Sequence, residues 1–199
     1  MKRKSSICEE FYRKSTDPWG FRTRWYERRK REIVVASLPR PSFESCWELG
    51  CSNGELTAAL APRCNRILAT DGNDIAVEEA RRRLTEFPQV EVEHAIHPGD
   101  WPEGRFDLIV FSELGYNFDQ ARLREIGQRL GETLLSAGVV LACHWRHPIE
   151  SCPLSGDEAH RILAEVLSLP RLVLHTEADF VLEAWSADAR SVAAFEGMV

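Results

Sequence analysis

The sequence has no long apolar run: the longest, Val139 to Cys143, is far short of the roughly 20 residues that cross a bilayer. No Cys-x-x-Cys pair occurs among its six cysteines, and Cys46, Cys51 and Cys143 lie within apolar patterns, so we expect reduced thiols. No apolar stretch follows the charged N-terminus, as a secretory signal would require. Together these absences predict a cytoplasmic protein that does not enter a membrane.

What is present is typical of one globular domain, with 199 residues of which 44% are hydrophobic and 28% charged. The net charge of -6 is unevenly distributed. Residues 1–40 hold 12 Lys or Arg against 5 Asp or Glu, whereas the remainder holds 13 against 26. Because Trp19, Phe21, Trp25 and Tyr26 interrupt the basic segment, we expect it to fold onto the acidic body rather than bind nucleic acid.

Short apolar runs alternate with amphipathic stretches from residue 44 onward. The pattern predicts strands over residues 45–49, 66–71, 90–96, 106–113, 138–144, 171–176 and 179–186, and helices over 54–61, 74–84, 121–135 and 156–169. Such alternation favours a parallel α/β sheet with helices on both faces, and the closing pair of strands has the spacing of an antiparallel hairpin. We expect a single compact domain in which residues 1–43 form a helical lid over a body of residues 44–199.

The turn after the first predicted strand, residues 48–54, points to a nucleotide-like ligand without phosphate. It does not match the dinucleotide fingerprint G-x-G-x-x-G, and no Gly-Lys-Ser/Thr follows it as in a phosphate loop. Trp47 to Thr57 contains two glutamates and no Lys or Arg, which suits a cationic ligand better than a pyrophosphate.

Acidic residues also follow the second and third predicted strands. Asp71, 21 residues after Gly50, can accept hydrogen bonds from both ribose hydroxyls. Asp100 can accept from an adenine amino group, and Trp101 can cover the ring. Each residue alone is more often a turn, cap or core residue. Their order on successive strand ends favours S-adenosylmethionine, with NAD as the weaker alternative.

Five blocks of the sequence form a recognisable series: the segment from Asp17 to Lys30, residues 48–52, 107–113 and 144–148, and the run Gly156-Asp-Glu-Ala-His160. In this order they resemble the motifs of the nodulation protein S group of small methyltransferases. The resemblance implies a Rossmann-like class I methyltransferase fold with strand order 3-2-1-4-5-7-6. It also implies S-adenosylmethionine as methyl donor, S-adenosylhomocysteine as product, and an N-methylated amine on a deacetylated chitooligosaccharide. The chain departs from the group at Leu49, where proline is frequent, and at residues 114–118 beside the expected acceptor pocket.

The expected site combines these strand ends with the lid. Trp19 would cover the cofactor and Arg31 would bind its carboxylate, whereas Trp25 and Tyr26 would pack against the body. The full set of expected cofactor-binding residues is Trp19, Arg31, Glu48, Gly50, Cys51, Ser52, Gly54, Asp71, Gly72, Asp100, Trp101 and Ser112. No metal is expected, because Cys143, His144, His147 and Cys152 fit no common zinc spacing.

Candidate catalytic groups follow the fourth and fifth predicted strands. Glu113, His144 and His147 are candidates for removing a proton from the acceptor, and Tyr116 and Arg146 are candidates for contacting it. Glu113 has a second interpretation as a carboxylate that orients the local backbone or pairs with Arg146.

Three functions remain open besides an NAD-dependent oxidoreductase. The leading one is N-methylation of a small-molecule amine, such as an amino sugar. The others are O-methylation of a hydroxyl and a cofactor-binding regulator without catalysis. We expect a small-molecule acceptor and a monomer or homodimer.

Overall fold

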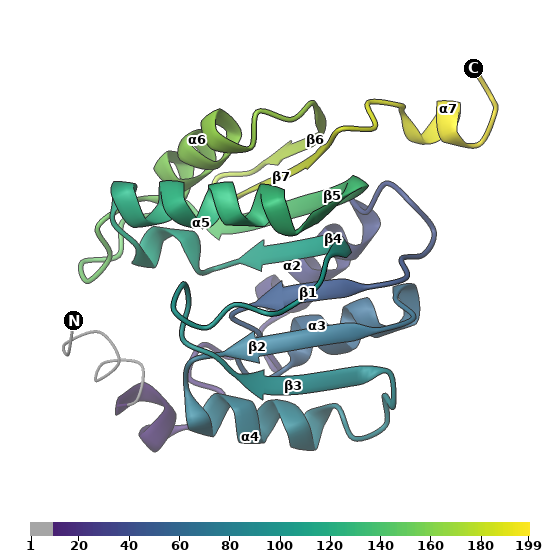
Figure 1. The fold of residues 1–199 in the computed structure, drawn as a ribbon. Helices are drawn as coiled ribbons and strands as arrows, with labels where there is room; N and C mark the ends of the chain where they lie inside the picture. The colour runs from purple at the N-terminus through teal and green to yellow at the C-terminus, as the bar shows by residue number, and fades with distance from the viewer. Residues whose placement is uncertain (1–9) are drawn as a thin grey trace.

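The computed structural model describes residues 10–199, and the first nine residues of the expected lid lie outside the described residues. A seven-stranded sheet in the order β3-β2-β1-β4-β5-β7-β6 forms the centre of the molecule (Figure 1). The strands are β1 (Cys46–Leu49), β2 (Ile67–Asp71), β3 (Val90–His94), β4 (Phe106–Ser112), β5 (Leu134–Trp145), β6 (Arg171–Thr176) and β7 (Phe180–Ser186). Strands β1 to β5 are parallel, and β7 pairs antiparallel with both β5 and β6. The expected fold class and strand order are confirmed.

The connecting helices are α2 (Trp25–Ala36), α3 (Glu55–Leu60), α4 (Asp74–Arg83), α5 (Gln120–Thr133), α6 (Gly156–Leu167) and α7 (Val192–Phe195), with short 3-10 turns η1 (Ala61–Arg63) and η2 (Gly115–Asn117). Asn73 caps α4 as its sequence position indicates, since its side chain accepts from the N–H groups of Ile75 and Ala76. Strand β5 begins at Leu134, inside the segment expected to be helical. Leu134 is buried and fits an apolar helix face or a strand equally well, so periodicity does not place this boundary.

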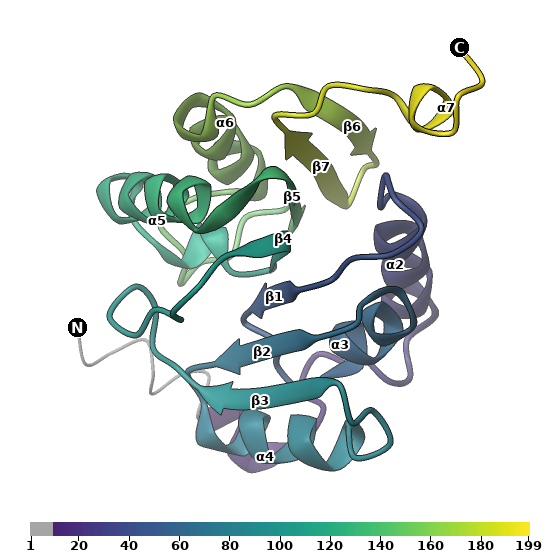
Figure 2. The ribbon, with the colours of Figure 1, turned by 45° about the vertical axis from the view of Figure 1, so that its right-hand side comes forward.

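Two apolar layers cover the sheet, as Figure 2 shows from the side. Helices α2, α3 and α4 pack on one face, and α5 and α6 pack on the other. Strand β4 contributes to both layers, because Leu108 and Val110 face the first and Ile109 and Phe111 face the second. This explains its nearly continuous apolar sequence, which is typical of a parallel strand buried on both sides.

The N-terminal segment packs against the body as its aromatic content predicts. Val34 on α2 is fully buried, and the Tyr26 ring packs edge-on against Trp145 and Phe180. The same expectation for Trp25 is wrong, because this side chain is 65% exposed at the first turn of α2. Across residues 10–199, none of the helices has the length and apolar character to cross a membrane.

Candidate active site

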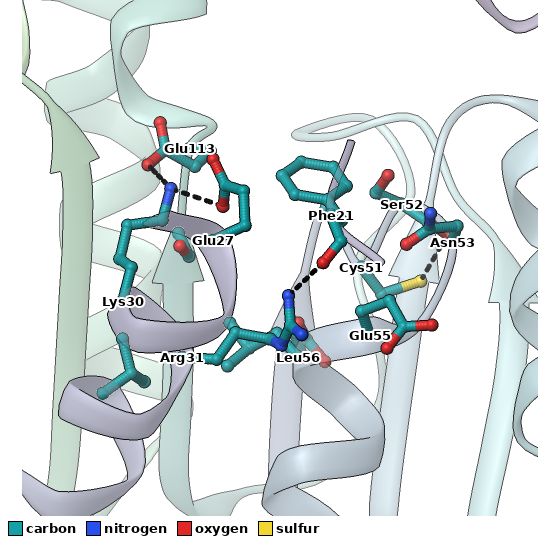
Figure 3. A pocket seen from close by; sticks show the side chains of 14 residues that line it. Phe21, Glu27, Lys30, Arg31, Cys51, Ser52, Asn53, Glu55, Leu56 and Glu113 are labelled. Atoms are coloured by element: carbon teal, nitrogen blue, oxygen red, sulfur yellow. Dashed lines mark hydrogen bonds and ion pairs between the residues drawn. The ribbon is translucent and has the colours of Figure 1, made fainter. Parts of the chain in front are cut away.

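A pocket lies at the carboxyl ends of β1 and β4, between these strands and helices α2 and α3 (Figure 3). Together with its mouth, which is open to solvent, it encloses about 460 Å³ of empty space. Its lining residues are Phe21, Glu27, Lys30, Arg31, Val34, Glu48, Gly50, Cys51, Ser52, Asn53, Glu55, Leu56, Ser112 and Glu113. Four of them are glutamates and two are cationic, so the lining is acidic as the sequence of the first turn predicts.

The floor of the pocket is the turn from β1 into α3. Gly50, Ser52 and Gly54 all adopt left-handed backbone conformations, with φ of 75°, 52° and 78°. A side chain at Gly54 would place its Cβ 3.2 Å from the Cα of Ala80, so only glycine fits there without displacing α4. Ser52 is a non-glycine residue in this region, an arrangement that concentrates at functional sites.

Asp71, at the end of β2, fixes this turn from the side. One carboxylate oxygen accepts from the N–H of Ser52 at 2.9 Å, and the other accepts from the N–H of Asn73 at 2.9 Å. Burial raises the pKa of Asp71 despite these bonds. Each oxygen retains a further lone pair, so the carboxylate can still accept from a diol.

Glu48 lies beneath the pocket with its side chain buried. Its Oε2 accepts the hydroxyl proton of Thr57 at 2.6 Å. Burial is the main cause that raises the pKa of Glu48 to about 7, and the negative charge of Asp71 adds to it. Burial also raises the pKa of the neighbouring Cys51 thiol, which therefore stays protonated at neutral pH.

Residues 10–24, which we call the arm, cover the same turn. The Tyr12 and Ser52 hydroxyls are hydrogen-bonded, and Asn53 donates its amide N–H to Asp17 Oδ1 at 3.1 Å. Asp17 also accepts from the backbone N–H groups of Phe21 and Arg22, which holds the arm in a closed turn.

Two N-terminal residues are expected at the cofactor, Trp19 of the arm and Arg31 of α2, and only Arg31 lines the pocket. Arg31 lines the pocket, where it donates to the carbonyl oxygen of Phe21 at 2.5 Å. Trp19 packs against Tyr12 and Phe21 and does not line the pocket, so it is Phe21 that the arm presents to the cavity.

A buried ion-pair cluster closes the other end of the pocket. The Lys30 ammonium lies 3.0 Å from Glu27 on the same helix and 2.9 Å from Glu113 Oε1 at the end of β4 (Figure 3). All three side chains are at most 20% exposed. Two carboxylates surround one ammonium, so the cluster carries a net negative charge when both are ionised.

Glu113 is held by several contacts in a left-handed backbone conformation, with φ of 54°. Its Oε2 accepts from the Tyr116 hydroxyl at 2.7 Å and from the Trp145 N–H at 3.2 Å. The suggested pairing of Glu113 with Arg146 is wrong. Arg146 instead pairs with Asp157 at 2.9 Å on α6, because β5 ends beside that helix.

The two candidate histidines lie outside the pocket lining. His144 is fully buried in β5, and its Nε2 accepts from the N–H of Gly115 at 2.9 Å. Burial lowers the pKa of His144 well below its ordinary value. His147 is about half exposed and pairs with Asp179 at 2.8 Å on the hairpin before β7. Neither ring faces the cavity in this structure.

Asp100, Trp101 and Gly72 are likewise not brought to the pocket lining. The Asp100 carboxylate accepts from the N–H of Ile96 at 2.8 Å and so closes its own loop. Trp101 packs under α5, where its Nε1 donates to Thr133 at 2.8 Å, its ring packs edge-to-face with Trp47, and Arg129 lies over the ring. An indole beside an apolar layer with a hydroxyl partner in reach packs there in a partly buried position.

Sequence reasoning expected Arg31 of α2 at the site but missed other residues of the pocket lining. Glu27, Lys30, Asn53 and Glu55 line the pocket, but none was among the expected site residues. A signal for two of them is visible in retrospect: Glu27 and Lys30 are three residues apart on one helix face, in a helix whose apolar side must be buried.

The residues present fit S-adenosylmethionine. The pocket has an acidic lining for a sulfonium, a glycine-containing turn that brings backbone close to a ligand, and Asp71 beside that turn. Glu48, Gly50, Cys51, Ser52, Ser112 and Arg31 are the expected cofactor residues among those lining the cavity.

The sheet order with its antiparallel hairpin and this pocket define the class I S-adenosylmethionine-dependent methyltransferase fold. The model of the family "Nodulation protein S (NodS)" matches residues 9–153, and the chain belongs to this family.

Curated relatives agree with this family membership. Nodulation protein S of Rhizobium tropici is 30% identical over 101 residues, which cover 50% of this chain and 42% of the relative. Nodulation protein S of Sinorhizobium fredii is 29% identical over 124 residues, which cover 61% and 57%. The chain thus spans about half the length of the curated relatives it matches.

Solved structures share the fold over most of the chain. A crystal structure from Pseudomonas syringae, of a protein assigned as a methyltransferase, is 47% identical with a TM-score of 0.74, covering 82% of this chain and 99% of that one. The N-methyltransferase NodS of Bradyrhizobium japonicum, in complex with S-adenosylhomocysteine, is 20% identical with a TM-score of 0.77. The shared region covers 92% of this chain and 97% of that one.

Proposed function

We propose that this protein transfers a methyl group from S-adenosylmethionine to the amine of a small molecule, with an amino sugar as the first acceptor to test. The observation that carries the proposal is the Glu27–Lys30–Glu113 cluster. In it, two carboxylates at the cofactor pocket already hold one primary ammonium group, that of Lys30, at 3.0 and 2.9 Å. Family membership supports the methyl donor, and the NodS relative is an N-methyltransferase.

The cofactor, when bound, supplies a methyl group on a positively charged sulfur, which is already an activated donor. The protein has to hold the acceptor nitrogen in line with the methyl carbon and the sulfur. Such positioning can lower the activation free energy by about 7–11 kcal/mol. The arm and α2 provide the walls that exclude water from this space, since Phe21, Arg31 and Val34 all line the pocket.

Glu113 is suited to receive the acceptor amine. An ammonium has no lone pair, so it must lose one proton before its nitrogen forms a bond to the methyl carbon. The Glu113 carboxylate attracts the ammonium and takes this proton, directly or through water, and then releases it to solvent. Tyr116 and the Trp145 N–H hold one carboxylate oxygen in place while the other faces the cluster.

No observation favours O-methylation in the same way. That reaction would need a base beside a hydroxyl, and neither His144 nor His147 lines the pocket. The acceptor nitrogen of the His144 ring is already used by Gly115.

The test is transfer of labelled methyl from S-adenosylmethionine to a deacetylated chitooligosaccharide, with the fully N-acetylated oligomer as control. We expect label on the free-amine oligomer alone. Label on the N-acetylated oligomer as well would contradict amine chemistry and favour a hydroxyl. Label on neither, with S-adenosylhomocysteine still raising the melting temperature, would contradict the amino-sugar acceptor and leave a binding protein or another acceptor.

A further inference from the structure

Two sequence blocks, residues 144–148 and 156–160, each contribute a histidine to one buried chain of hydrogen bonds. The Gly115 N–H donates to His144 Nε2 at 2.9 Å. His144 Nδ1 lies 3.1 Å from His160 Nε2, and His160 Nδ1 lies 2.7 Å from Glu183 Oε2. The chain ends where Arg171 donates to Glu183 Oε1 at 2.8 Å. It runs along the α6 side of the sheet, from η2 through β5 and α6 to β7, and ends on β6.

The direction of every proton in this chain is determined by its first member. A backbone N–H can only donate, so His144 Nε2 must be unprotonated and Nδ1 must carry the proton. His144 Nδ1–H then donates to His160 Nε2, which leaves the proton of His160 on Nδ1. That proton is donated to Glu183, and the carboxylate can only accept when it is ionised. The Gly115 N–H at one end and the Glu183 carboxylate at the other therefore require the same tautomers of both rings.

Such a chain is costly where it lies. His144, His160 and Glu183 are all at most 5% exposed, and apolar residues of the same volume would fill this layer without a desolvation penalty. At the η2 end of this hydrogen-bond chain only glycine fits at residue 115, because a Cβ there would lie 2.8 Å from His144 Nε2. Its polar groups are satisfied only with the η2 backbone in this one position.

We propose that His160 and Glu183 are positioning residues for methyl transfer, acting through the His144 tautomer to hold η2 in place. The η2 turn begins at Gly115 and carries Tyr116, whose hydroxyl donates to Glu113 Oε2. A shift of η2 would therefore release the Glu113 carboxylate, whose role in binding the acceptor amine is the proposed function on which this step rests. Among the described residues, no hydrogen bond joins the cofactor turn, residues 50–54, to Gly115, His144, His160 or Glu183.

The experiment compares Glu183→Gln with Glu183→Met in the full-length protein. Gln keeps an oxygen that accepts the His160 Nδ1 proton, whereas Met removes it at similar volume. In the Met variant the His160 Nδ1 proton has no acceptor, so one of the three bonds that favour the Nδ1–H tautomers is lost. His160 is then less firmly fixed, and the His144 ring that bonds the Gly115 N–H is fixed less firmly with it. Glu165→Met makes the same change on the surface of α6 and serves as the matched control.

The first readout is the ¹⁵N resonances of the two histidine rings. We expect Nδ1–H tautomers of both rings in the wild type and in Glu183→Gln, and a mixture of Nδ1–H and Nε2–H tautomers in Glu183→Met. The Gly115 amide should exchange with solvent about tenfold faster in the Met variant, as for loss of one ordinary hydrogen bond. An Nε2–H tautomer of His144 in the wild type would overturn the proposal without any variant.

The second readout is kinetic and uses the deacetylated oligomer. Glu183→Met should lower kcat about tenfold while S-adenosylhomocysteine affinity stays within about twofold, and Glu183→Gln should restore kcat. A tautomer change without a change in kcat would overturn the positioning role. If the oligomer is not an acceptor even for the wild type, the proposed function fails, whereas the tautomer and exchange measurements still decide whether the chain holds η2.

Discussion

At the scale of single residues, the site depends on side chains held in unfavourable states by their neighbours. Glu113 has a left-handed backbone, which costs a non-glycine residue about 1–3 kcal/mol. Three partners, Lys30, Tyr116 and the Trp145 N–H, hold its carboxylate in return. The position of Glu113 at the end of a buried strand could be predicted from the sequence. Its pairing with Lys30 could not, because the two are 83 residues apart and meet only where α2 docks.

Replacing Glu113 with Gln should separate its role in transfer from its role in packing. Gln keeps the size and can still accept from Tyr116, but it neither attracts an ammonium nor takes its proton. We expect kcat for the free-amine oligomer to fall at least about 100-fold, with S-adenosylhomocysteine affinity changed by less than about twofold. Glu125→Gln, which alters an exposed pair with Arg122 on α5, is the control. Wild-type turnover in Glu113→Gln would exclude Glu113 from the reaction.

At the scale of elements, alternation of strands and helices could be predicted because each has its own apolar period, 2 or 3.6 residues. The arm has no such period, and its position depends on individual polar contacts. The sequence indicates that its aromatic residues pack, but not which ones: Tyr26 is covered by β5 and β7 whereas the adjacent Trp25 is exposed. Trp101 lies against the layer under α5 rather than in the pocket lining for a related reason. The side chain of a residue in the loop after a strand can turn to either face of the sheet.

Asp17 is the residue on which the closed arm depends most. Its carboxylate accepts from Phe21, Arg22 and Asn53, which lie in the arm and in the cofactor turn. Asp17→Ala should therefore loosen the cover over the pocket and weaken S-adenosylhomocysteine binding about tenfold, measured by titration calorimetry.

The matched control for the arm is Asp119→Ala. Asp119 caps α5 by accepting from the N–H of Arg122. Loss of this cap should cost about 1 kcal/mol of stability and leave ligand affinity unchanged. Equal affinity in the two variants would show that the arm does not contribute to the cofactor site.

At the scale of the whole molecule, the fold places buried carboxyl groups under the pocket, and this should make global stability depend on pH. The pKa of Glu48 is raised to about 7 in the folded protein, above its ordinary value of 4.5. The folded state therefore binds more protons than the unfolded state between these values. Its stability should fall as the pH rises from about 4.5 to about 7, and stay lowered above that.

Glu48→Gln should remove this dependence, because Gln stays neutral and its amide oxygen can still accept the Thr57 hydroxyl proton. The free energy of unfolding of the variant relative to the wild type should increase by about 2–3 kcal/mol between pH 5 and pH 8, since each unit of pKa shift corresponds to about 1.4 kcal/mol. Urea titrations at the two pH values measure it, with Glu91→Gln on the solvent-facing side of β3 as control. A difference that stays constant with pH would mean that Glu48 is ionised in the folded protein, because an ionised Glu48 would contribute the same charge to the folded and unfolded states throughout this range.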